Sequence, residues 1–243
     1  MRRLSSYLRI LLKKFEEIYL PLPNSLCRDI VEGSLSKDVY DPSISLRYLN
    51  SSLERLWRPV LEEMHSLSRT TGLWDKDIIC YYKDDYLRDL EDAGVEISRL
   101  LILANVYGRI DLDSWIKIFE RRNRSVVEDL LERVSREKIS IIVDNYVDYV
   151  LISDARKGIN LEKCVFNEVI PAPQDLLIIY LMRSGGREEK ILLEIISWVI
   201  RFYNKIILTE NFDEVYNSFI MDKDYIRFLE SMRLNPINNK CVD

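Results

Sequence analysis

Five consecutive polar residues near the middle of the chain have side chains suited to binding phosphate: Arg121, Arg122, Asn123, Arg124 and Ser125. Arginine guanidinium groups form paired, charge-assisted hydrogen bonds with phosphate oxygens. A helix that begins at about Ser125 would add the backbone N–H groups of its N-terminus. Three further basic residues follow at Arg133, Arg136 and Lys138. The pattern predicts a contact site for phosphate groups.

Arg58 and His65 are the second candidates for chemistry. His65 is the only histidine of the chain, and the spacing of the pair resembles that of the helical HEPN ribonucleases. In such an enzyme the histidine activates a ribose 2′-hydroxyl and the arginine stabilises the phosphate charge. The family usually has a polar residue after the arginine, whereas Pro59 stands there in this sequence. We therefore expect an ordinary exposed or capping histidine and keep ribonuclease activity as a remote alternative.

Other catalytic and metal-binding patterns are missing from the sequence. It has no glycine-rich phosphate loop, no dinucleotide-binding motif and no G-x-S-x-G nucleophile motif. An E-x-K triplet at 188–190 and two acidic residues at 222–224 fit the first turn and cap of helices better than a metal site. We expect no enzymatic activity, no cofactor and no metal.

Composition and net charge describe a folded, helix-rich protein. Of its 243 residues 47% are apolar and 31% charged, with only 7 glycines and 7 prolines. The net charge is −5, whereas nucleic-acid-binding domains are often strongly basic, so DNA contact requires a local basic patch. Isoleucine is abundant while alanine, glutamine, threonine and histidine are scarce, which is compatible with an AT-rich genome and with a thermophile.

Cysteine spacing and apolar runs bear on the compartment. The cysteines at 27, 80, 164 and 241 lie at least 53 residues apart, so no C-x-x-C pair starts a zinc or redox site. We expect a reducing, cytoplasmic setting. The most apolar window, 191–208, contains Glu194, Arg201 and Lys205, so we expect a soluble protein without membrane contact.

Apolar residues at helical spacing predict helices over most of the chain. We expect a first helix over 4–19, which Pro21 and Pro23 stop. Two more helices are expected over 44–69 and over 75–94, the latter with Gly94 as its C-terminal cap. The last four are expected over 174–183, 188–208, 211–220 and 223–233. A proline-rich break at 171–173 marks a boundary. The predicted fold class is mainly α, with an N-terminal helical region 1–94, a central region 95–156 and a C-terminal helical region 157–243.

Residues 97–152 show a more specific order of elements. The spacing predicts a helix that ends at Gly108, a strand over 110–112, a helix carrying Trp115 and Phe119, a third helix over 125–136, and a small β-hairpin formed by KISIIV and YVDYVLIS that turns at Asp144-Asn145. On the third helix the apolar residues, among them Leu130, lie on the inner side and Arg133 lies toward the outside.

This order of elements resembles the winged helix-turn-helix superfamily, over residues 97–152 only. In DNA-binding members the third helix enters the major groove while its N-terminus and the wing touch phosphates. The resemblance therefore implies double-stranded DNA as ligand, with Arg121 to Ser125 at the phosphates, and a homodimer on a twofold site. Asp144 and Asp148 make the predicted wing acidic, which opposes a phosphate contact there.

The same segment also resembles the winged helix of PCI modules, which joins subunits of large assemblies. Val127, Glu128, Leu130 and Leu131 match that pattern, and Ile139 and Asp144 match it approximately. This resemblance implies a protein partner, and the acidic wing fits it better than it fits DNA. A DNA-binding, regulatory protein is the first hypothesis, and an interaction scaffold is the alternative.

Overall fold

The computed structural model describes residues 14–34, 39–49, 51–70, 77–121, 130–134, 140–142, 147, 150, 152, 170–183, 188–209 and 212–232. The chain is mainly helical, as expected. It divides into two compact units: the first contains Met1–Asp89 and Ser125–Asn145, and the second contains Leu90–Arg124 and Tyr146–Asp243. The region 95–156, expected to be one domain, is thus shared between the two units.

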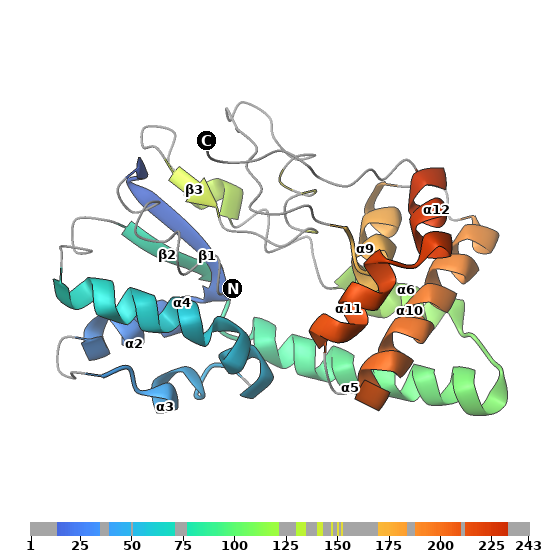
Figure 1. Ribbon diagram of the computed structural model, residues 1–243, viewed down its shortest axis with the longest axis horizontal. Coiled ribbons are helices and arrows are strands. Elements are labelled where there is room, and N and C mark those ends of the chain that lie inside the picture. Colours follow the sequence, from blue (N-terminus) through green and yellow to red (C-terminus); the bar gives the residue numbers. More distant parts are fainter. Residues whose placement is uncertain are drawn as a thin grey trace. The chain divides into compact units, whose positions relative to one another are not determined.

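The first unit is built on a parallel three-stranded sheet in the order β2-β1-β3 (Figure 1). The strands are β1 (Glu17–Pro23), β2 (Asp77–Tyr82) and β3 (Ser140–Ile142). Glu17 is the register partner of Asp77 on one side and of Ser140 on the other. All seven residues of β1 are buried, which is typical of a central strand in a parallel sheet.

Two prolines lie in this central strand. Proline has no backbone N–H to donate to a neighbouring strand, so it is unusual there. β3 pairs with residues Glu17 to Tyr19 of β1, and Pro21 and Pro23 come after that stretch. The register with β2 also shifts between Leu20 and Pro23. The prolines therefore occupy the half of β1 where fewer sheet hydrogen bonds are required.

Three helices follow β1 in the chain: α2 (Asn24–Ser34), α3 (Pro42–Ser45) and α4 (Ser51–Thr70). α2 packs on β1 and β2, and α4 packs on α2 (Figure 1). The side chain of Asp41 accepts a hydrogen bond from the Ser43 N–H at 2.9 Å and so caps α3. Leu26, Val60 and Leu61 are fully buried in this unit.

The second unit is helical. Its elements are α5 (Tyr86–Tyr107, whose first residues belong to the first unit), α6 (Leu112–Arg121), α9 (Pro173–Arg183), α10 (Glu189–Thr209), α11 (Phe212–Ile220) and α12 (Lys223–Ser231). α10 packs against α6, α9 and α11. The core of the second unit contains the rings of Trp198, Phe202, Phe219 and Tyr225, with centroid distances of 5.2 to 6.0 Å between neighbouring rings. None of the described helices is long and apolar enough to cross a membrane.

Several predicted helix ends are confirmed. Gly108 has a φ of 61°, and its N–H bonds to Ala104 while that of Arg109 bonds to Leu103. The left-handed glycine and the bond from its N–H to Ala104 are an αL capping motif, which ends α5. The Asp222 side chain accepts from the N–H groups of the two residues at 224 and 225, so it caps α12 as expected.

Other predicted elements were wrong. The helix expected to reach residue 19 is replaced by β1 in its last residues, and the expected helix 75–94 is replaced by β2 and the first part of α5, which runs through Gly94. Leu112 begins α6 and is not part of a strand.

The hairpin predicted over 138–153 is not formed by its described residues. β3 pairs in parallel with β1, and Val147, Val150 and Ile152 are helical. Short apolar stretches such as these suit either a strand or a buried helix. β3 is a strand because it pairs with β1, which is distant in the sequence.

Candidate functional site

The structure describes two of the eight predicted phosphate-binding residues. Arg121 is the last residue of α6, and Arg133 lies in the stretch 130–134. The other six, Arg122, Asn123, Arg124, Ser125, Arg136 and Lys138, lie outside the described residues. Arg121 belongs to the second unit and Arg133 to the first, so the two are described separately.

Residues 130–134 have the inner and outer sides that the sequence predicts. Residues 130–133 are helical, Leu130 is 0% exposed, and Glu132 and Arg133 are exposed. Leu131 and Val134 are half-buried. This part of the predicted helix 125–136 therefore packs through Leu130 and presents Arg133 to solvent, as a binding helix requires.

A tyrosine of the central strand holds the end of this helix. The Tyr19 hydroxyl lies 3.0 Å from the Arg133 carbonyl oxygen and 3.0 Å from a carboxylate oxygen of Glu17, and its single proton is shared between these two acceptors. Tyr19 is fully buried and Glu17 is 5% exposed. Because alternate residues of a strand face the same side, Glu17 and Tyr19 form one polar pair on β1. The backbone at Arg133 is thereby fixed to the sheet.

A second group of polar side chains, the α4 polar cluster, consists of Tyr40, Ser45, Glu54, Arg58 and His65. The two carboxylate oxygens of Glu54 accept hydrogen bonds from Arg58, from Nε at 2.9 Å and from Nη2 at 2.7 Å. The Glu54 side chain is 1% exposed and that of Arg58 is 44% exposed. The Tyr40 hydroxyl donates to Ser45 at 2.5 Å. Burial raises the pKa of Tyr40, so it remains a donor at neutral pH.

The geometry of this cluster bears on the suggested ribonuclease pair. His65 is 7% exposed, and its ring lies 6.2 Å from that of Tyr40 in an edge-on contact. The expectation of an exposed or capping histidine was therefore wrong, because His65 is buried within α4. Two of the Arg58 nitrogens are engaged by Glu54. These contacts join the segment 39–49 to α4, and ribonuclease activity of the pair stays a prediction.

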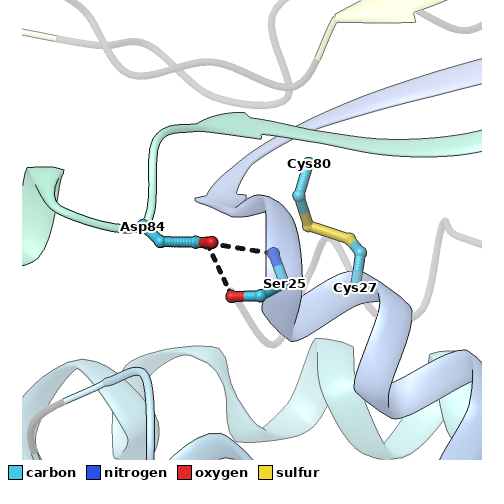
Figure 2. Close-up of a disulfide and its surroundings, with 4 residues drawn as sticks. All are labelled: Ser25, Cys27, Cys80 and Asp84. Atoms are coloured by element: carbon cyan, nitrogen blue, oxygen red, sulfur yellow. Dashed lines mark hydrogen bonds between the residues drawn. A yellow bond between two sulfur atoms is a disulfide. The ribbon is translucent and has the colours of Figure 1, made fainter.

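The carboxyl ends of β1 and β2 are joined by a third set of contacts (Figure 2). Asp84, just after β2, accepts hydrogen bonds from the Ser25 N–H at 3.0 Å and the Ser25 hydroxyl at 2.6 Å. This carboxylate therefore caps the first turn of α2, where the helix dipole favours negative charge. Nearby, Cys27 of α2 and Cys80 of β2 form a disulfide. The expectation of reduced thiols was wrong for this pair.

Sequence reasoning missed both the Tyr19–Glu17 pair and the disulfide. The contact of this pair with the Arg133 carbonyl and the disulfide both join elements that are distant in the sequence: Tyr19 is 114 residues from Arg133, and the two cysteines are 53 residues apart. No local spacing marks such contacts. Among the described residues, no group of three or more histidine, cysteine, aspartate or glutamate side chains could hold a metal ion.

No protein-family model matches the chain, and no curated protein or solved structure is significantly similar to it. Its function is therefore argued from its own residues.

Proposed function

We propose that this protein is a non-catalytic, regulatory DNA-binding protein that presents helix 125–136 to double-stranded DNA. The observation that supports this most directly is the orientation of residues 130–134. Leu130 is fully buried, Arg133 is exposed, and the Arg133 carbonyl is held by Tyr19. In helix-turn-helix proteins an exposed helix carrying basic side chains enters the major groove, and Arg133 would be such a side chain.

The charge distribution restricts the proposed contact to a short part of the chain. Between Lys117 and Lys138 there are seven basic and five acidic residues, whereas the whole chain has a net charge of −5. Phosphate contacts would come from Arg121, Arg122 and Arg124 together with the helix N-terminus at Ser125, and Arg133, Arg136 and Lys138 would extend them. A wing has no part in the proposal, since the described residues of the segment 138–153 do not form the predicted hairpin.

The proposal also includes the cellular compartment of the protein. We place the protein in the cytoplasm, where a regulatory protein meets DNA. The Cys27–Cys80 disulfide is unusual for the cytosol of a mesophile, but intracellular proteins of hyperthermophiles are often rich in disulfides. The composition is compatible with such a source.

Fluorescence anisotropy with labelled, mixed-sequence duplex DNA tests this function. We expect binding that weakens as salt is added, because each phosphate contact releases counterions. The triple variant Arg121→Glu, Arg122→Glu, Arg124→Glu should lose binding. A matched control is Arg227→Glu on α12, because Arg227 is exposed and lies outside the proposed site. Retained binding by the triple variant would refute the assignment.

The alternative function is a scaffold subunit with a PCI-like winged helix that binds another protein. One observation favours it: large apolar side chains are exposed on α5, with Val95 at 71%, Ile102 at 58% and Val106 at 68%. Such exposure is typical of interaction surfaces. Stable association with a co-purifying protein that is insensitive to salt, together with no DNA binding, would support this function over the first.

A further inference from the structure

Helix α5 has apolar residues on two opposite sides. On one side Ala93, Ile97, Leu100 and Leu101 are buried, each at most 9% exposed. On the other side Val95, Ile102 and Val106 are largely exposed. These three are separated by seven and four residues, close to two turns and one turn of helix, so they form a line of side chains, the outer stripe. A helix that is apolar on both sides is normally covered on both.

The outer stripe extends onto α10. Asn105 and Asn204 donate to each other's side-chain oxygens at 2.8 and 3.0 Å, so the end of α10 lies beside α5 at this level. One turn further along α10, Ile207 is 63% and Leu208 is 84% exposed. All of these residues belong to the second unit. These two side chains add exposed apolar area to the same unit.

The sign of the exposed charges changes along the outer stripe. Acidic side chains predominate among the exposed residues around its beginning, with Asp89, Glu91, Asp92 and Glu96 against Arg88, so the net charge there is negative. Exposed basic side chains lie beside its middle and just past the helix end, at Arg99 and Arg109. The two ends of the stripe thus have opposite charge. A second α5 in the antiparallel direction would bring acidic against basic ends, whereas a parallel one would bring like charges together and cost free energy.

We propose that the outer stripe of α5 binds the same stripe of a second copy of this chain, antiparallel and about a twofold axis at the level of Leu100 and Leu101. In this register Val95 packs against Val106 of the second copy, Asp92 approaches Arg109 of the second copy, and each contact occurs twice by symmetry. The stripe is about 17 Å long from residue 95 to residue 106, at about 1.5 Å per residue. This interface does not depend on DNA binding.

Sedimentation velocity and light scattering over a range of concentrations test the interface. The wild-type protein should form a dimer. Val106→Glu should raise the dimer dissociation constant at least about tenfold, equivalent to about 1.4 kcal/mol. Met221→Glu is the control, because Met221 is 79% exposed in the same unit but lies outside the stripe. A wild-type monomer at all concentrations, or a dimer unchanged by Val106→Glu, would overturn the proposal.

A charge exchange tests direction and register without altering the apolar residues. Asp92→Arg alone should weaken the dimer, since it places two positive charges together at each end of the interface. Adding Arg109→Asp to the same chain should restore it, because the attractive pair is rebuilt with reversed signs. Circular dichroism of each variant checks that α5 remains helical. Failure of the double variant to recover dimer formation would exclude the antiparallel register, even if some other dimer exists.

Discussion

The buried polar side chains of the described residues lie in the first unit, whereas the core of the second is dominated by aromatic rings. The buried serine, histidine and glutamate residues are Glu17, Ser25, Ser45, Glu54 and His65. In the second unit, Trp198, Phe202, Phe219 and Tyr225 pack together, and the Tyr225 hydroxyl donates to the Pro171 carbonyl at 2.7 Å.

The difference concerns how each unit achieves a unique structure. A buried polar group is costly unless it is hydrogen-bonded, so the contacts of the first unit tolerate few alternative arrangements. Aromatic rings contribute mainly through the area they bury. We infer that the first unit serves as the rigid base from which Arg133 is presented, and that the second unit is suited to association through apolar surface.

Breaking the disulfide should cause the largest loss of stability, and only in the first unit. A crosslink between two residues 53 apart lowers the conformational entropy of the unfolded chain. In the loop-entropy model this stabilises the folded unit by about 4 kcal/mol. Calorimetry with and without reductant should show a lowered transition for the first unit and an unchanged one for the second. Cys164→Ser with Cys241→Ser is the control that keeps the crosslink. Equal shifts of both transitions would contradict the separation of the units.

Tyr19→Phe should destabilise the same unit by a smaller amount. It removes the hydroxyl that donates to Glu17 and to the Arg133 carbonyl while leaving the ring in place. We expect a loss of about 2 kcal/mol in the free energy of unfolding, measured by urea denaturation, because buried acceptors lose a hydrogen-bond donor. Tyr107→Phe is the matched control, because Tyr107 is 71% exposed. Equal stability of the two variants would mean that Tyr19 does not fix the Arg133 helix.

The smallest predicted effect concerns the second unit. Asp222→Ala removes the side chain that caps α12, and N-cap removal typically costs about 1 kcal/mol. Asp222→Asn should retain nearly full stability, since asparagine caps as well as aspartate. Thermal unfolding of the three proteins measures the difference. Destabilisation by asparagine equal to that by alanine would indicate that the charge, and not the cap, is what matters.

The same comparison explains what the sequence could predict. Helices α9 to α12 were predicted to within two residues at each end, because their apolar spacing, the proline break at 171–173 and the Asp222 cap are local signals. These signals lie within the segments themselves, so no distant contact was needed to interpret them.

The strands of the first unit could not be recognised in this way. The apolar runs of β1 and β2 are buried on a parallel sheet, and short continuous apolar runs fit a buried helix equally well. Their pairing joins residues about 60 apart, Glu17 with Asp77. The inner and outer sides at Leu130 and Arg133 were predicted correctly because they depend only on helical periodicity, whereas the hydrogen bond from Tyr19 depends on the fold.

The central claim is that the helix containing Arg133 contacts DNA phosphates, and the salt dependence of binding tests it most directly. Anisotropy titrations of duplex DNA at several salt concentrations should give a log–log slope steeper than about −3, since each phosphate contact contributes about −0.9. Arg133→Glu should make that slope shallower by about one unit, and Arg227→Glu should leave it unchanged. Absence of binding at low salt, or a slope unaffected by Arg133→Glu, would contradict the account.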